Sequence, residues 1–372
     1  MMTQTTEEQE IQEKSGKNGM SASELLVHAS RKSGKSVGKI TRDLWRLRRG
    51  KGKISLLEYV TWQLYDDRFS SEEKDRFISN NLHWPITYEC CDRSWDAVTE
   101  DKYLADTILR EGGVPVPETV AVIDKTQRHY GDITKITDAD ALRDLLTQEA
   151  VLPLFGKVLR GICSFGAFHV TDADQTHIHL KNQSPVTYNE FINNMIGDTP
   201  YLLQRIVGNH SAIDDLCSAT ATVRMVTMVR DDDIFFPLAS IKIPGGDNIA
   251  DAFWRPGNIC SNIDPKTGEF LNITTSDGPD LIRHDSHPET GRKFIGETLP
   301  DWDKLLEIST LAARLFTPVR YQSLDVALSD NGPVVIEINT GGGFDLPQNA
   351  SGVGMMTDEV RDFFRECGSK LV

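Results

Sequence analysis

The sequence predicts an α+β protein in which a helical N-terminal region precedes sheets built from antiparallel hairpins. Two observations lead to this fold class. Apolar residues recur at helical spacing from about residue 21 to residue 80. From about residue 95, short runs rich in β-branched and aromatic residues follow, separated by turn-forming residues. These runs do not alternate regularly with helices, and no repeat is visible at a period of roughly 20–50 residues, which argues against βαβ units and against a solenoid.

The region before residue 95 is expected to hold no chemistry. Residues 1–20 are polar and charged with few apolar side chains, which predicts a disordered tail. Residues 21–94 predict a set of short helices, one of which Ser70 or Ser71 can cap. No cluster of polar side chains in these helices suggests a reaction, so we expect a scaffold or partner-binding role.

The remaining chain predicts helices and strands in mixed order. Helical spacing of apolar residues and acidic first turns predict helices over residues 96–110, 138–146, 301–316 and 357–367. β-Branched and aromatic runs predict strands over residues 119–123, 153–160, 166–170, 176–180, 201–207, 221–230, 234–243, 321–328 and 333–338.

Charge is distributed unevenly along the chain. The net charge is −15, which argues against nucleic acid as a main partner. Residues 31–53 nevertheless hold ten Lys or Arg and one Asp, a net charge of +9, which leaves −24 for the rest of the chain. This segment could make a peripheral contact with an anionic membrane or another polyanion. The alternative is a solvated basic helix face.

The N-terminus and the cysteines bear on the expected location. The first residues lack the apolar core of a secretory signal, and no apolar run approaches the roughly 18 residues needed to cross a bilayer. The six cysteines are scattered without a C-x-x-C pair, which favours reduced thiols. Both observations favour a cytoplasmic location.

The most informative segment is an acidic hairpin predicted over residues 323–339. The tight-turn signal Asp-Asn-Gly lies between two strand-like runs, and a three-residue loop would centre the hairpin on Asn331. Asp325 and Glu337 would then lie opposite each other. The two-residue period of a strand puts Asn339 on the same side as Glu337.

Opposed carboxylates on this hairpin favour a metal site. The other face of the second strand carries an apolar set suited to a core, namely Val334, Ile336 and Ile338. Two facing carboxylates repel each other unless a cation lies near them, and Mg²⁺ typically takes one or two carboxylates together with phosphate oxygens. We therefore predict Asp325, Glu337 and Asn339 as magnesium ligands. The alternative is an edge hairpin with solvated acids.

A second segment offers cations to phosphates. Lys157 lies in an apolar strand, where an unpaired lysine would be costly. The following loop, 160–166, is flanked by glycines and contains Ser164, so it could direct backbone N–H groups at phosphates. The alternative is an ordinary hairpin turn with a lysine that extends to solvent. Residues 33–36 do not form a Walker phosphate loop, because the first glycine and the preceding strand are missing.

Three further side chains are candidates on weaker grounds. Lys102 opens a helix and could bind phosphate, or it could be a solvated helix lysine. Gln204 lies near the end of an apolar strand and could contact an adenine edge, since its amide both donates and accepts hydrogen bonds. Arg224 lies within an apolar strand, where a buried guanidinium usually meets an acid or a phosphate. A structural salt bridge is its alternative.

The order of these motifs resembles the ATP-grasp superfamily over residues 95–345. Lys102 precedes a helix and G-G-V-P-V-P, and the final motif has the form D-x(11)-E-x-N. The finer resemblance is to the sugar-transfer-associated ATP-grasp group. It is carried by L-L-Q-R-I-V-G-N-H at 202–210, T-V-R-M-V-T at 222–227, S-N-I-D-P-K-T-G at 261–268, D-V-A-L-S-D-N-G-P-V-V-I-E-I-N at 325–339 and L-Y-D-D-R-F at 64–69.

The resemblance implies an ATP-grasp fold in which two α/β subdomains clasp ATP. We place these at residues 95–200 and 201–372, the second with the metal site and a C-terminal helix. The residues then expected to bind ATP are Lys102, Lys157, Ser164, Gln204, Arg205, Val207 and His210. Arg224 and Lys157 would be catalytic by neutralising charge on the transferring phosphoryl group, and Asp325, Glu337 and Asn339 would hold Mg²⁺.

The chain also departs from common ATP-grasp patterns. Gln204 stands where many of these enzymes have Glu, and Asp325 stands where Glu is more common as the first metal ligand. Gly341 follows the E-I-N-T motif in place of the Arg of biotin carboxylases, which disfavours that reaction.

The activity implied by the resemblance is an ATP- and magnesium-dependent carboxylate–amine ligase that works through an acyl phosphate. Its substrates would be a small carboxylate and an amine. An amino acid or peptide joined to an acid in glycan or natural-product assembly would fit. The alternatives are a phosphotransferase with a hydroxyl acceptor and a non-catalytic ATP-binding module. The sequence identifies neither the acid nor the amine, and it leaves the oligomeric state open.

Overall fold

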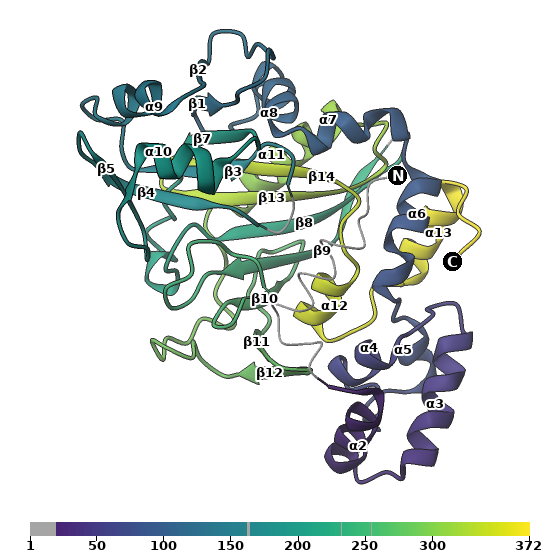
Figure 1. Ribbon diagram of the computed structural model, residues 1–372. Coiled ribbons are helices and arrows are strands. Elements are labelled where there is room, and N and C mark those ends of the chain that lie inside the picture. The colour runs from purple at the N-terminus through teal and green to yellow at the C-terminus, as the bar shows by residue number, and fades with distance from the viewer. Residues whose placement is uncertain (1–19, 162–163, 232, 254) are drawn as a thin grey trace.

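The computed structural model describes residues 20–161, 164–231, 233–253 and 255–372. The predicted N-terminal tail therefore lies almost entirely outside the described residues. The body contains two seven-stranded sheets, and a helical unit extends from one end of it (Figure 1). The predicted α+β class is confirmed. Within the described part of the chain, no helix is long and apolar enough to span a membrane.

The helical unit is formed by short helices with a core of their own. They are α2 (Ala22–Ser33), α3 (Val37–Arg49), α4 (Leu56–Thr61) and α5 (Ser71–Asp75). Each begins after a serine whose hydroxyl accepts a backbone N–H, and Ser70 caps α5 as predicted. The buried side chains that hold them together include Leu25, Ile40, Leu47, Tyr59, Trp62 and Phe77.

The first sheet has the strand order β2-β1-β7-β3-β4-β5-β6. Its strands are β1 (Thr119–Ile123), β2 (Thr134–Ile136), β3 (Leu154–Val158), β4 (Phe168–Ala173), β5 (His177–Leu180), β6 (Val186–Thr187) and β7 (Tyr201–Arg205). Only the pair β1 and β2 is parallel. The helices α9 (Ala139–Leu146) and α10 (Tyr188–Glu190) and the π-helix η4 (Phe191–Ile196) supply apolar side chains to its core. β7 follows the expected subdomain boundary at residue 200, yet it lies inside this sheet.

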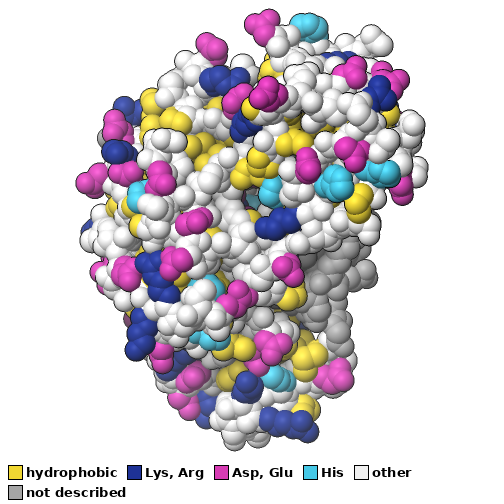
Figure 2. All heavy atoms as spheres, turned by 90° about the vertical axis from the view of Figure 1, so that its left-hand side faces the viewer, with side chains coloured by type: hydrophobic (Ala, Val, Ile, Leu, Met, Phe, Trp, Pro, Cys, Tyr) yellow, Lys and Arg dark blue, Asp and Glu magenta, His cyan; other side chains and the backbone are white. Residues whose placement is uncertain are grey.

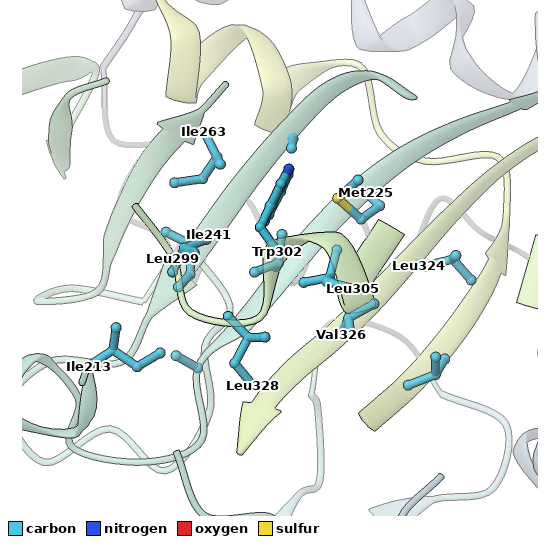
Figure 3. Close-up of a cluster of buried hydrophobic side chains, with 14 of the residues drawn as sticks. Ile213, Met225, Ile241, Ile263, Leu299, Trp302, Leu305, Leu324, Val326 and Leu328 are labelled. Atoms are coloured by element: carbon cyan, nitrogen blue, oxygen red, sulfur yellow. The ribbon is translucent and has the colours of Figure 1, made fainter. Parts of the chain in front are cut away.

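The second sheet has the order β12-β11-β10-β9-β8-β13-β14 and is antiparallel throughout. Its strands are β8 (Thr222–Val229), β9 (Ile234–Ile243), β10 (Ile259–Ile263), β11 (Ile273–Asp277), β12 (Asp280–His284), β13 (Tyr321–Ser329) and β14 (Gly332–Thr340). Helix α11 (Trp302–Leu315) packs on it. Figure 3 shows Trp302 and Leu305 beside Met225 and Leu324 of the sheet, all buried in one hydrophobic cluster.

The other helices pack around this body. They are α6 (His83–Cys90), α7 (Asp96–Glu100), α8 (Lys102–Glu111), α12 (Asp345–Ser351) and α13 (Asp358–Glu366), with 3₁₀ turns η2 (Asn80–Leu82), η3 (Arg93–Trp95) and η5 (Asp214–Leu216). The single helix predicted over 96–110 is wrong. It breaks at Asp101, whose side chain accepts the N–H of Leu104 and so begins a new helix. The described cysteines are free thiols, and Cys163 lies outside the described residues.

Candidate functional site

The acidic hairpin joins β13 to β14 and brings its two carboxylates together. Asp325 pairs with Glu337, as predicted. The predicted three-residue loop is wrong, because Ser329 pairs with Gly332 and leaves a two-residue turn. Between Asp325 and Val326 the register shifts by one residue, because β14 contains one extra residue there. This shift offsets the shorter turn, so Asp325 still lies opposite Glu337.

The same register shift changes which residues of β14 face the core. Val335 and Ile338 lie in the hydrophobic cluster under α11. Val334 and Ile336, which were predicted to join Ile338 there, are only half-buried. The bulge moves the strand by one position, so the residues on its N-terminal side point to the opposite face.

Asp325 lies within a buried group of charges on the second sheet. Arg224, its neighbour on β8, donates to both of its carboxylate oxygens, at 2.6 Å and 2.8 Å. Lys242 of β9 lies 3.2 Å from one of these oxygens and 3.1 Å from Asp251. Thr222 also donates to Asp251. The expected alternative for Arg224, a buried salt bridge, is therefore what the structure contains.

The pKa values in this group follow from the balance of burial and charge. Burial alone would raise the pKa of Asp325, but the charges of Arg224 and Lys242 outweigh it and hold the pKa well below its usual range. Burial opposes the charge of Arg224, yet Asp325 raises its pKa. For Lys242 the nearby carboxylates likewise outweigh burial and raise the pKa. All three groups are charged near neutral pH.

A second group of charges joins the two sheets. Lys102, the first residue of α8, places its Nζ 3.0 Å from the Glu337 carboxylate and donates to the carbonyl of Gly161 at 2.6 Å. Lys157, on β3 of the first sheet, donates to the carbonyl of Ile336 on β14 at 3.2 Å. The predicted phosphate-binding lysines and the predicted metal ligand Glu337 thus lie together.

Lys157 is the least compensated cation of this group. Burial lowers its pKa, and the nearby charges of Asp106 and Glu337 only partly oppose that effect. Among the described residues, no carboxylate lies within ion-pair distance of its ammonium group, which contacts only a carbonyl. A buried ammonium held by one carbonyl is a site that favours an added anion.

Gln204 lies at the edge of this group on β7. Its amide nitrogen donates to the Asp106 carboxylate at 2.8 Å and to the Thr119 hydroxyl at 3.0 Å. Asp106 is buried, and burial raises its pKa despite Lys157 and Gln204. The Gln204 donors are therefore engaged within the protein, and its contact with adenine stays a prediction.

Other predicted nucleotide-binding residues make hydrogen bonds elsewhere in the protein, with backbone carbonyls and a hydroxyl outside the charged groups. Arg205 donates to the carbonyls of Ala150 and Val151. The Val207 carbonyl accepts the hydroxyl of Thr220 at 2.6 Å. His210 lies at the turn of the acidic hairpin, where its backbone N–H donates to the Leu328 carbonyl.

The predicted phosphate loop is described only in part, because residues 162 and 163 lie outside the described residues. The Ser164 carbonyl accepts a hydrogen bond from Arg255 at 3.2 Å, which links the loop to the segment after β9. Ser164 has a φ of +57°, an αL conformation uncommon for a non-glycine residue. The loop's contact with phosphate stays a prediction.

Of the three residues expected to hold magnesium, Glu337 and Asn339 fit that role and Asp325 is engaged by other side chains. The side chain of Glu337 is 26% exposed, and only one of its oxygens contacts Lys102. Asn339 lies two residues along β14 and is half-buried, and its carboxamide makes no hydrogen bond with the described residues. Asp325 is 5% exposed and engaged by Arg224 and Lys242. No group of three or more His, Cys, Asp or Glu in the described chain is placed to hold a metal.

Sequence reasoning missed three members of the site, namely Lys242, Asp251 and Asp106. A signal existed for Lys242, since it lies between Ile241 and Ile243 in an apolar strand, the same context that pointed to Lys157. Asp251 lies in a loop and Asp106 on a helix, and only the tertiary fold brings these two acids to the lysines.

The surface beside the first sheet is hollowed. Seen from the side on which β4 and β5 lie in Figure 1, it has a depression near its centre, with hydrophobic side chains gathered above it (Figure 2).

A family model described as "Sugar-transfer associated ATP-grasp" matches residues 87–361. This chain belongs to that family. The matched segment contains both sheets and every charged residue of the site, so the ATP-grasp fold predicted from the motif order is confirmed.

Several solved structures are similar to this ATP-grasp chain at low identity. They include the VanG D-Ala:D-Ser ligase from Enterococcus faecalis, at 13% identity, covering 74% of this chain and 64% of that one, with a TM-score of 0.41. A D-alanine–D-alanine ligase from Bacillus anthracis matches at 16% identity, 73% and 67% coverage and a TM-score of 0.40. The biotin carboxylase domain of a Hydrogenobacter thermophilus 2-oxoglutarate carboxylase matches at 11% identity, 78% and 51% coverage and a TM-score of 0.42.

This chain thus spans between about half and two thirds of the length of these structures. No curated protein matches the sequence.

Proposed function

We propose that this ATP-grasp protein is an ATP- and magnesium-dependent ligase that joins a small carboxylate to an amine through an acyl phosphate. The observation that carries the proposal is Lys157, a buried ammonium group that reaches across to β14 and contacts only a carbonyl among the described residues. Lys102 adds positive charge beside Glu337, and Arg224 adds it beside Asp325, the strand partner of Glu337. Such a group of fixed cations is suited to phosphates that gain charge as a phosphoryl group is transferred.

The salt bridges of Asp325 suggest how the site receives a nucleotide. Arg224 and Lys242 neutralise Asp325 in the present structure. A triphosphate carries more charge than one carboxylate, so we infer that both cations turn toward phosphate oxygens when ATP binds. Asp325 would then be released to act as the third metal ligand. The pairs shown here would hold the cations in place until ATP enters.

Magnesium would bind through Glu337 and Asn339, which are half-buried and not fully engaged by the protein. When bound, it would neutralise charge on the phosphates during transfer. The cationic side chains of the site have the other roles. Lys102 and Lys157 position the phosphates, while Arg224 offers its guanidinium to the transferring group.

The description of the matching family names sugar transfer. We infer that its acid or amine substrate belongs to glycan or natural-product assembly in the cytoplasm. An amino acid, a peptide or a sugar acid would suit the chemistry.

A screen of carboxylate and amine pairs, read as amine-dependent ADP release with mass analysis of the products, tests this proposal. Glu337→Gln should abolish turnover, because it removes charge from a metal ligand and leaves Lys102 without its carboxylate. Glu307→Gln on the exposed face of α11 is the matched control and should behave as the wild type. Thermal unfolding of both variants shows whether the fold is intact.

Hydroxylamine separates the reaction classes. An acyl phosphate reacts with it to give a hydroxamate, whereas a phosphotransferase that uses a hydroxyl acceptor gives none. ATP consumption without hydroxamate would replace the ligase by the phosphotransferase. Failure of the wild type to bind Mg-ATP by calorimetry would leave only a non-catalytic module.

A further inference from the structure

The outer face of α3 carries a cluster of exposed arginines around one tryptophan. Arg42, Trp45, Arg48 and Arg49 recur at three- and four-residue spacing, so they lie on one side of the helix. All four are exposed, while Ile40 and Leu47 on the opposite side are buried in the core of the helical unit. We call these four residues the arginine–tryptophan face.

Trp45 is unusually exposed for its type. Its relative exposure is 55%, the highest value among the exposed large hydrophobic residues of the described chain. The Arg49 guanidinium lies 3.7 Å from the centre of its ring, in a cation–π contact. The ring therefore projects from the protein with a cation stacked on it, and it adds nothing to the buried core of the helical unit.

The arginines of this face have no acidic partner within the part of the chain that the structure describes. No carboxylate of the described residues lies within ion-pair distance of Arg42, Arg48 or Arg49. Arg46, one helical turn from Arg42 and also exposed, lies 2.6 Å from Asp75. Three of the four arginines of α3 therefore have no acidic partner among the described residues.

The position of α3 leaves the face accessible. In Figure 1 the helix lies at the outer edge of the helical unit, on the side away from both sheets. The exposed residues Lys51 and Lys53 follow it directly and extend the positive charge. The remainder of the chain has a strongly negative net charge, so the segment 31–53 differs from it by its net positive charge.

We propose that the arginine–tryptophan face docks on the anionic phospholipid surface of a membrane. Arginines gain affinity from anionic headgroups, and a tryptophan ring prefers the boundary between headgroups and acyl chains. A soluble polyanion would be attracted by the arginines alone and would give the ring no apolar partner, so the central tryptophan favours a lipid surface. With a single aromatic anchor, the attachment would be reversible.

Co-sedimentation of the full chain with vesicles tests the proposal. Binding is expected to vesicles of phosphatidylcholine mixed with phosphatidylglycerol, to be absent with phosphatidylcholine alone, and to weaken as salt rises. Arg42→Gln with Arg48→Gln should lower the affinity about 25-fold, because each basic residue at such a surface contributes about fivefold. Trp45→Ala should weaken vesicle binding but leave binding to soluble heparin unchanged.

The matched control is Lys293→Gln with Ile295→Ala. It removes an exposed cation and an exposed hydrophobic residue that lie beside the core of the second sheet, and it should bind vesicles as the wild type does. All substitutions are at exposed positions, and thermal unfolding should show an unchanged fold. Equal binding by the wild type and the double arginine variant would overturn the proposal. So would a Trp45→Ala variant that binds vesicles normally, which would indicate a general polyanion site.

Discussion

Replacing Asp325 by Asn tests whether its carboxylate compensates the positive charges of Arg224 and Lys242, as the structure indicates. Asp325 is the carboxylate that Arg224 and Lys242 share, and its side chain is 7% exposed. The substitution would leave Arg224 without a carboxylate at ion-pair distance, while Lys242 would keep Asp251 at 3.1 Å. Breaking a buried ion pair in this way costs about 3–5 kcal/mol.

The double variant Asp325→Asn with Arg224→Met gives the sharper result. It removes one negative and one positive charge together, so the pair of Lys242 and Asp251 remains balanced. Replacement of both members of a buried pair is often close to neutral. We therefore expect the double variant to be more stable than Asp325→Asn alone, although it carries one substitution more.

Thermal unfolding without nucleotide measures both effects. If the second sheet and its helices unfold as one unit, a loss of 3–5 kcal/mol lowers the Tm by about 6–20 °C. Asp362→Asn is the control, since its pair with Arg365 is exposed and such pairs contribute about 0–1 kcal/mol. The single variant Arg224→Met is measured as well. A double variant whose loss of stability equals the losses of Asp325→Asn and Arg224→Met added together would refute the balanced-charge account. So would an Asp325→Asn variant as stable as the control.

Three further predictions concern the same structure. The pKa of Asp325 lies below its unfolded value of about 4, so its contribution to stability is present above that pH and is lost as the pH falls below it. The Tm of the wild type should therefore drop more between about pH 5 and about pH 3 than that of Asp325→Asn. Gln204→Leu should cost about 1.5–3 kcal/mol, measured by urea unfolding, because buried Asp106 loses its amide donor. Gly341→Ala should cost more than Gly113→Ala in the same assay. Both glycines have a positive φ. At Gly341 the added methyl group would lie 2.7 Å from other side-chain atoms, whereas at Gly113 it would meet no atom within 4 Å.

The elements with strong local signals could be predicted, and the reasons for the failures are equally local. The strands predicted over 119–123 and 234–243 match β1 and β9 residue for residue. Strands β10 to β12 were not predicted. The segment 270–284, which holds β11 and β12, is rich in Thr, Asp and Asn and has little apolar alternation. Pairing of β11 with β10 and of β12 with β11 therefore decides its structure more than propensity does.

The pairing of Asp325 with Glu337 was predicted correctly, but the turn length on which the prediction rested is wrong. The turn is one residue shorter than expected, and a bulge in β14 compensates for it. A bulge has no clear signature in a single sequence, because it depends on twist and on contacts with neighbouring strands. The same bulge explains why Val335, and not Ile336, lies in the core.

The glycines after β14 show how a functional pattern can have a structural cause. A run of three glycines, 341–343, directly follows the predicted metal-binding hairpin. In the structure Gly341 has a φ of +70° and lies against His83 and Thr87, and the Gly342 N–H donates to the His83 ring at 3.0 Å. Burial lowers the pKa of His83 to about 4, so it is a neutral acceptor at physiological pH. These glycines therefore fit the chain against α6.

The described site holds as many basic side chains as acidic ones, and this bears on how ligands enter it. The buried or half-buried cations are Lys102, Lys157, Arg224 and Lys242, and the acids beside them are Asp106, Asp251, Asp325 and Glu337. Phosphates that drew the cations toward themselves would leave Asp325 and Glu337 facing each other without compensation. A divalent metal bound between those carboxylates would remove that repulsion. Nucleotide and metal should therefore each strengthen the binding of the other, because each repairs the charge imbalance that the other creates.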